Sequence, residues 1–334
     1  MRLLPVVAVA SLAFAGSAGA QAIYTGGVNG AYHGSFCPPL AKELGQAYYN
    51  MACTPTAGTV ENVTKILAQP GNVGFGQFDV LALMAAENPD VAKKIQVIRD
   101  DVAKECMFVI TNNERLVSID DLGKYASRIP FVLPPKGSGS AATFELLQRG
   151  NPEGLGKASN VTYAASVDDM IKRVLDSPNA VGLFVQLPDP GNAVFKTIAA
   201  RKGRFVSVIN RNLLNMKVGD RAVYVPVKTD VEGISVIEPK GGPLTTTCTS
   251  TVIFTGKAEL FPEANNARKN QSDMIAAVTA MDRAKLVPAT ATGATAEMSK
   301  AWAWLKAKTT IVTAATVDGI TKATDAARKK IGEL

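Results

Sequence analysis

A glycine-rich turn, Thr-Gly-Gly-Val-Asn-Gly-Ala-Tyr at residues 25–32, constrains the fold of this chain more than any other stretch. It follows a short apolar segment at residues 22–24 and leads into a helical pattern from Phe36 to Leu44. Glycine tolerates positive φ and lets a ligand approach the backbone, and a helix start presents free N–H groups to an anion. The turn therefore predicts a strand–turn–helix unit that either binds an anion or simply makes a tight turn.

A dinucleotide-binding fingerprint is the other obvious interpretation of this turn, and the spacing argues against it. The glycines fall as Gly26-Gly27-x-x-Gly30. The next predicted strand ends at Cys53-Thr54-Pro55, with no acidic residue to bind a ribose. We therefore set a Rossmann-type site aside and expect no cofactor.

The amino terminus has the pattern of an export signal. Arg2 precedes an apolar run from Leu3 to Phe14, and small residues suited to cleavage follow at 18–20 and 20–22. The run is too short to span a bilayer. Residues 1–20 are therefore predicted to be a cleaved signal peptide, which places the mature protein in the periplasm.

Length and charge limit the class of function. The chain has 334 residues, 47% of them hydrophobic, which suggests two domains rather than one. Its net charge is +7, but the basic residues are scattered and only Arg328-Lys-Lys330 forms a run. Because nucleic-acid binding needs a basic patch with interleaved aromatics and the aromatic content is 6%, we expect no nucleic-acid partner.

Strands and helices alternate along two successive series, which predicts an α/β fold with a parallel sheet covered by helices. The first series spans residues 22–112 and includes a helix from Thr59 to Gln69, with Thr59 as candidate N-cap, and two strands at 94–100 and 105–111. The second begins after a break at residues 112–114. In it, Ser118 and Ser166 open helices. The β-branched run at 245–255 is interpreted as the chain crossing back, and residues 261–334 as Ala-rich helices.

Several short motifs together resemble a known family. Besides the first turn they are Gly58-Thr-Val-Glu-Asn62, Val73-Gly-Phe-Gly-Gln77-Phe-Asp79-Val, Asp121-Leu-Gly-Lys124, Pro135-Lys-Gly-Ser-Gly-Ser140 and Val181-Gly-Leu-Phe-Val-Gln186. In this order they are similar to the TAXI group of TRAP-transporter solute-binding proteins, over roughly residues 23 to 255.

The resemblance implies a two-lobed, type II periplasmic binding protein-like α/β fold, each lobe a mostly parallel sheet flanked by helices. A ligand cleft would lie between the lobes. Lobe I would comprise residues 21–112 and 240–334, and lobe II residues 113–239, with hinges near 111–114 and 228–232. The usual ligands of such proteins are small organic acids or acidic amino acids, such as glutamate or 2-oxoacids.

The function expected from the resemblance is capture of a small anionic metabolite by a monomeric protein that delivers it to membrane transporter subunits. A periplasmic ligand sensor without a dedicated transporter is the alternative, and an enzyme on the same fold comes third. His33 is the only histidine. Because no nucleophile and orienting group accompany it, we expect no catalysis.

The candidate ligand-binding residues come from both lobes. They are Thr25, Gly26, Gly27, Tyr32, Thr59, Asn62 and Gln77 in lobe I, and Ser138, Gly139, Ser140 and Gln186 in lobe II. The serines and Gly139 would form an anion cradle at a helix amino terminus. Plainer alternatives remain open: Ser138 as an N-cap, Gln77 as an ordinary polar group at a strand end, and Asp79 as the cap of its helix.

Four cysteines in an exported chain indicate two disulfides, for which three pairings exist. We predict Cys37–Cys53, which flank the first helix, and Cys106–Cys248, which lie in β-like runs that the expected fold places side by side. A redox role is disfavoured because no Cys-x-x-Cys occurs. His33 and Cys37 could share a helix face as metal ligands, but two ligands make no zinc site and we predict no metal.

Overall fold

The computed structural model describes residues 21–287, without 29, 190, 230, 232–233 and 236–243. The predicted signal peptide and the Ala-rich segment from residue 288 onward lie outside this part of the chain. Within it, no helix combines the length and apolar character needed to cross a membrane.

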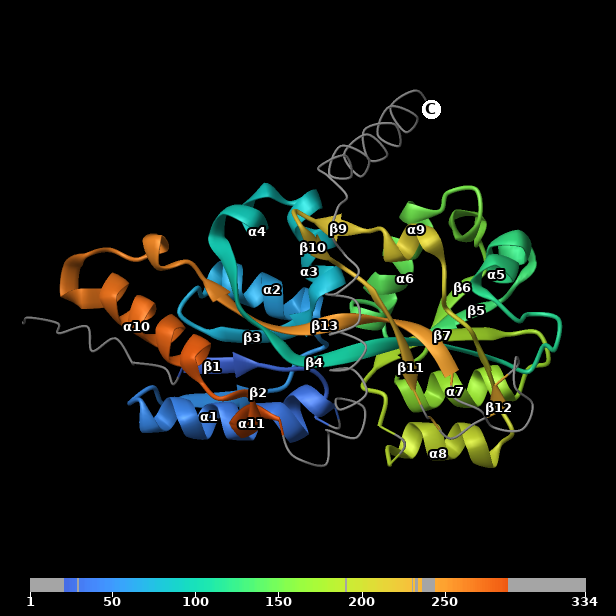
Figure 1. Ribbon diagram of the computed structural model, residues 1–334, viewed down its shortest axis with the longest axis horizontal. Coiled ribbons are helices and arrows are strands. Elements are labelled where there is room, and N and C mark those ends of the chain that lie inside the picture. Colours follow the sequence, from blue (N-terminus) through green and yellow to red (C-terminus); the bar gives the residue numbers. More distant parts are fainter. Residues whose placement is uncertain are drawn as a thin grey trace, which may run out of the picture.

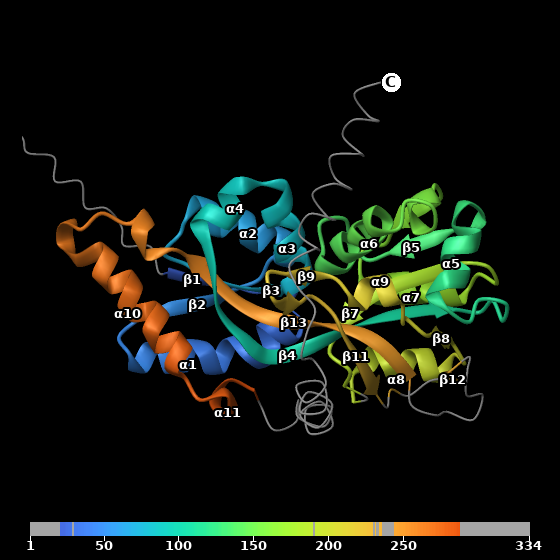
Figure 2. The same ribbon diagram turned by 45° about the horizontal axis from the view of Figure 1, so that its top comes forward.

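Two lobes share one mixed sheet, in the order β2-β1-β3-β13-β4-β7-β5-β6 (Figure 1). Parallel strands β2-β1-β3 form the first lobe and β7-β5-β6 the second. Strands β4 and β13 run antiparallel to each other through both lobes, as the second view also shows (Figure 2). The strands are β1 Gln21–Tyr24, β2 Met51–Thr54, β3 Val73–Gln77, β4 Ile95–Thr111, β5 Phe131–Leu133, β6 Val161–Tyr163, β7 Val181–Gln186, β8 Arg204–Val206, β9 Lys217–Val218, β10 Arg221–Ala222, β11 Val225–Thr229, β12 Ile234–Ser235 and β13 Leu244–Gly256.

Helices cover the sheet in each lobe. Those of the first lobe are the π-helix η1 Tyr32–Phe36, α1 Cys37–Gln46, α2 Thr59–Ala68, α3 Phe78–Glu87, α4 Pro89–Lys94, α10 Ala267–Ala280 and α11 Arg283–Leu286. Those of the second are α5 Ile119–Tyr125, α6 Gly139–Gly150, α7 Val167–Leu175, α8 Ala193–Ala200 and α9 Arg211–Leu214. The predicted α/β class, with parallel strands and flanking helices in each lobe, is confirmed.

The core follows the two faces of the sheet. One apolar cluster is continuous across the lobes and includes Val63 of α2, Phe78 of α3 and Phe144 of α6. The opposite face carries a separate cluster in each lobe, under α1 and α10 in the first and under α7 and α8 in the second. The lobes therefore share apolar packing along the face that carries α2, α3 and α6.

Strand β4 corrects the expectation of two strands at 94–100 and 105–111, because it is continuous from Ile95 to Thr111. The pairing of β4 with β13 shifts register between Thr251 and Phe254, which accommodates the polar residues Asp100 and Asp101 within the ladder. A polar interruption in a strand pattern can therefore mark an irregular ladder rather than a strand end.

The passage from lobe to lobe lies in the middle of these long strands. Thr251 pairs with Gln77 of the first lobe, whereas Cys106 pairs with Gln186 of the second. Thr111, where a hinge was expected, pairs with Val181 well inside the second lobe.

Both predicted disulfides are confirmed. Cys37 and Cys53 tie the start of α1 to β2, with their Cα atoms 5.9 Å apart. Cys106 and Cys248 stand directly opposite each other on β4 and β13, and link these strands where they enter the second lobe.

Candidate functional site

Two helices from different lobes begin at the same place. Helix α2 starts after Gly58, whose φ of +128° favours glycine, so Gly58 and not Thr59 is its N-cap. Helix α6 starts after Ser138, whose Oγ accepts a hydrogen bond of 3.2 Å from the backbone N of Ala141. A Cβ on Gly58 would lie 3.5 Å from the backbone N of Gly139. The amino termini of α2 and α6 therefore lie against each other across the junction.

Gln77 lies close to both helix starts. Its backbone N–H donates to Thr59 Oγ1 at 3.1 Å. A Cβ on Gly139 would lie 1.7 Å from Gln77 Oε1 and 3.3 Å from Thr59 Oγ1, so only glycine permits this approach. The structure thus brings together Thr59, Gln77, Ser138 and Gly139, and each helix start contributes a partial positive charge.

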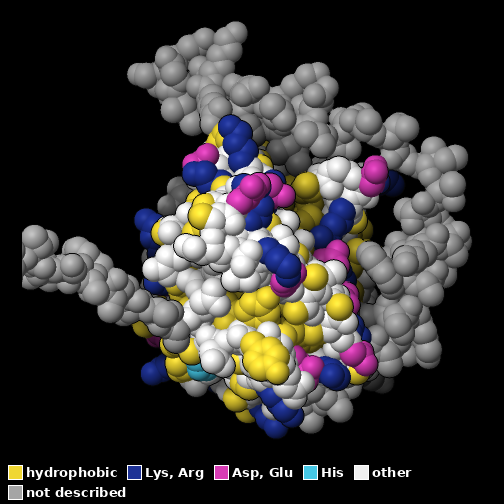
Figure 3. Space-filling view, turned by 90° about the vertical axis from the view of Figure 1, so that its left-hand side faces the viewer, with side chains coloured by type: hydrophobic (Ala, Val, Ile, Leu, Met, Phe, Trp, Pro, Cys, Tyr) yellow, Lys and Arg dark blue, Asp and Glu magenta, His cyan; other side chains and the backbone are white. Residues whose placement is uncertain are grey.

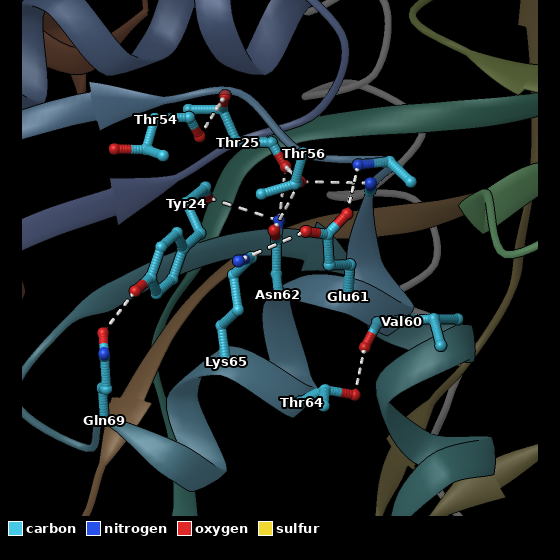
Figure 4. A network of polar contacts seen from close by, with 12 residues as sticks. Tyr24, Thr25, Thr54, Thr56, Val60, Glu61, Asn62, Thr64, Lys65 and Gln69 are labelled. Carbon is cyan, nitrogen blue, oxygen red and sulfur yellow. Dashed lines mark hydrogen bonds and ion pairs between the residues drawn. The ribbon is translucent and has the colours of Figure 1, made fainter.

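Thr25 and Asn62 instead hold the first lobe together (Figure 4). Asn62 Nδ2 donates to the carbonyls of Thr25, Tyr24 and Phe75, and its Oδ1 accepts from Thr56 Oγ1 at 2.6 Å. Thr25 Oγ1 donates to the Thr54 carbonyl at 3.1 Å and also contacts His33 Nδ1. Both side chains are fully buried and bond the glycine-rich turn to its neighbours.

The other candidates are distributed around the junction. Ser140 Oγ accepts from the backbone N of Val185 at 2.9 Å, which fixes α6 to β7. Gln186 is half-buried at the end of β7, and Gly27 is exposed on the first turn. Gly26 lies against the ring of Tyr32, since a Cβ there would stand 3.6 Å from Tyr32 Cδ2. Ser138 is the N-cap that the plainer alternative predicted.

Two carboxylates are buried at the junction, namely Asp79, which the sequence suggested as a helix cap, and Glu105, which the sequence did not single out. Glu105 of β4 is 8% exposed and accepts hydrogen bonds from Tyr32 OH and, at 3.3 Å, from Thr251 Oγ1. Burial raises the pKa of Glu105 to about 7, with a further increase from the charge of Asp79. Tyr32 also stacks on Phe75, at 5.6 Å between ring centroids.

Asp79 is fully buried where α3 of the first lobe meets α6 of the second. Its Oδ2 accepts from Thr143 Oγ1 at 2.7 Å and from Tyr224 OH at 2.9 Å. Burial raises its pKa, and these two hydrogen bonds partly oppose the increase. The carboxylate joins the lobes rather than capping α3, whose N-cap is Gln77. The available signal was an acidic residue inside an apolar run, as for Glu105 before Cys106-Met-Phe-Val.

Further contacts bind the lobes beside Asp79. Glu87 of α3 forms an ion pair with Arg149 of α6, so polar contacts occur near both ends of α3. Arg221 of β10 pairs with Asp100 at 3.0 Å and lies 3.7 Å from the centroid of the Phe78 ring. The lobes are therefore in contact along α3 and α6.

A separate groove of about 500 Å³ lies at the far end of the first lobe. Figure 3 shows that end, where hydrophobic side chains gather on the surface. The groove is lined by aromatic, amide and small or apolar side chains, namely Gln21, Ala47, Tyr48, Tyr49, Phe261, Ala267, Asn270, Gln271 and Met274. It therefore presents no charged group to an anion, in contrast to the junction.

Comparisons with known proteins find likeness at the level of solved structures. A scan against models of protein families and a search of curated proteins find no match. Similar structures include a periplasmic transporter, 12% identical, covering 88% of this chain and 99% of that chain with a TM-score of 0.43. An ABC-type phosphate transport receptor from Vibrio cholerae is 10% identical, with 77% and 94% covered and a TM-score of 0.40. The GluR0 ligand-binding core in complex with L-glutamate is 10% identical, with 82% and 100% covered and a TM-score of 0.40. At such low sequence identities and TM-scores these structures carry no argument about function, which rests on the residues of this chain.

Proposed function

We propose that this chain is an extracytoplasmic solute-binding protein that captures a small organic acid or acidic amino acid between its lobes. The observation that supports this most is the meeting of the α2 and α6 amino termini around Gln77. Each helix start offers backbone N–H groups and a partial positive charge, so together they suit a carboxylate. Because one start belongs to each lobe, an anion would be held fully only when the lobes are closed.

The destination of the ligand is proposed from the sequence motifs. Their resemblance to the TAXI group supports delivery to a TRAP-type membrane transporter, and the amino-terminal pattern supports export to the periplasm. The protein would act as a monomer. We further propose that the lobes open by bending β4 and β13 in the middle, at residues 103–106 and 248–251. The lobe boundaries at residues 112 and 239 remain a prediction.

A thermal-shift screen of refolded protein tests the proposed function. The probes are L-glutamate, glutarate, 2-oxoglutarate, inorganic phosphate and a neutral sugar such as glucose. We expect the melting temperature to rise with one class of small carboxylate, because a ligand that binds only the folded state stabilises it. A rise with the neutral sugar and with none of the anions would show that the proposed ligand class is wrong.

A matched pair of variants ties such binding to the junction. Gln77→Ala should reduce the shift produced by the binding carboxylate, because Gln77 lies between the two helix starts. Gln148→Ala, on the outer part of α6, serves as control and should leave the shift unchanged. Equal shifts in both variants would place the ligand elsewhere.

A further inference from the structure

We infer that the carboxylates of Asp79 and Glu105 form a site for the ammonium group of the ligand, so that the ligand is a zwitterionic amino acid. This inference rests on the proposed function and deepens it. The two carboxylates would form a negatively charged part of the junction, beside the partial positive charges of the helix starts.

The partners of the two carboxylates are hydroxyl groups. Glu105 Oε2 accepts from Tyr32 and Thr251, and Asp79 Oδ2 accepts from Thr143 and Tyr224. Within the described part of the chain, no ion pair forms on either carboxylate. Buried carboxylates are normally paired with a cation, since removing their charge from water is costly. A positively charged ligand group would supply the missing partner.

One oxygen of this pair lacks a hydrogen-bond partner. Asp79 Oδ1 is buried, and no described group meets hydrogen-bond geometry with it. The backbone N–H groups of Asp79 and Val80 lie near the carboxylate and lower its pKa. A buried acceptor without a donor is uncommon in folded proteins and calls for an explanation. An ammonium group carries three donors and no acceptor, which matches this need.

The unpartnered oxygen belongs to the same junction as the helix starts. Gly139 and Thr143 are four residues apart on α6 and therefore share a face, one turn from each other. Gly139 contacts Gln77, and Thr143 contacts Asp79. Asp79 thus contacts α6 one turn beyond its amino terminus.

Strand β13 brings Glu105 to the same place. Thr249 pairs with Glu105, and its Oγ1 accepts from the backbone N of Asp79 at 3.3 Å. Thr251 pairs with Gln77 and donates to Glu105. Both acids and Gln77 therefore surround one short stretch of β13. A ligand whose carboxylate lies at the helix starts would have its α-ammonium group within reach of the acids.

The test compares amino acids with analogues that lack the ammonium group. Isothermal titration calorimetry at pH 8 would use L-glutamate against glutarate and L-aspartate against succinate, with wild-type protein. We expect the amino acid of one pair to bind about 10- to 100-fold more tightly than its analogue, because hydrogen bonds to charged groups stabilise most when buried. Asp79→Asn should reduce this ratio at least tenfold, whereas Asp168→Asn, an exposed residue of α7, should preserve it.

The outcomes separate the two proposals. If wild-type protein binds glutarate or succinate as tightly as the amino acid, the ammonium site is wrong and the carboxylate-binding function stands. If Asp79→Asn weakens both members of a pair equally, Asp79 is only structural. If neither carboxylate binds and glucose does, the proposed function itself fails. The wild-type comparison remains decisive even if the Asp79 variant does not fold.

Discussion

Asn62 is predicted to bind ligand, and its described hydrogen bonds all lie within the first lobe. Its amide joins the glycine-rich turn, β1 and β3 through hydrogen bonds to three carbonyls and one hydroxyl. A sequence pattern shows a polar residue in the first turn of a helix, but not the direction in which its side chain points. The polar contacts that decide this come from residues up to 38 positions away in the chain.

Asn62→Ala should therefore lower the free energy of unfolding by about 3 kcal/mol, because buried carbonyls would lose their donor. Thr64→Ala on the exposed face of α2 is the matched control and should cost less than about 0.5 kcal/mol. Urea unfolding followed by circular dichroism measures both. A small effect for Asn62→Ala would mean that water replaces the amide.

Glu105 should make stability depend on pH. Because its pKa is raised from 4.5 to about 7 in the folded state, the folded protein retains a proton that the unfolded chain releases in this interval. The free energy of unfolding should therefore fall as pH rises from 4.5 to 7, by about 3 kcal/mol from this residue. Glu105→Gln should remove that fall, and the exposed Glu153→Gln should retain it. Parallel pH profiles for wild type and Glu105→Gln would contradict the assignment.

At the scale of elements, the start of α6 decides how closely the lobes approach. Gly139 has no side chain to separate α6 from Gln77 and Thr59, whereas Gly150 at the other end of the same helix has open space around it. A side chain at Gly139 would therefore clash with the neighbouring lobe, whereas one at Gly150 would not. The difference arises from the neighbouring lobe and not from the helix itself.

Gly139→Ala should destabilise the protein by about 1–3 kcal/mol, because the new Cβ displaces the buried side chain of Gln77. Gly150→Ala should be neutral or slightly stabilising, since alanine favours the helix. Differential scanning calorimetry compares the melting temperatures of the two variants with that of the wild-type protein. The double variant Gln77→Ala with Gly139→Ala should recover part of the loss, and failure to do so would place the strain elsewhere.

The elements were largely predictable where a local signal fixes them. Ser118, Ser138 and Ser166 cap their helices as the sequence indicated, because an N-cap bonds only to residues two or three positions away. The continuity of β4 was missed, since Asp100 and Asp101 resemble a strand end. The burial of Asp79 and Glu105 was not predicted, because it depends on partners such as Thr143 and Thr251, which are distant in the chain.

For the whole molecule, the two disulfides close loops of very different length. Cys37 and Cys53 are 16 residues apart, and Cys106 and Cys248 are 142 apart. If constraint of the unfolded chain dominates, replacing Cys106 and Cys248 with alanine should cost about 5 kcal/mol, and replacing Cys37 and Cys53 about 3 kcal/mol. Equilibrium unfolding in guanidinium chloride measures the free energy of unfolding of both double variants. The reverse order would show that local packing at the short loop matters more.

Strand β13 lies between β3 and β4 in the shared sheet, although residues 112–243 separate it from the end of β4 in sequence. An amino-terminal fragment that ends before Leu244 would leave the edges of β3 and β4 unpaired. During synthesis, the first lobe therefore cannot complete its sheet until nearly the whole described chain has emerged. Strand β11 of the second lobe also pairs with β13, so both lobes depend on this late strand to complete the shared sheet.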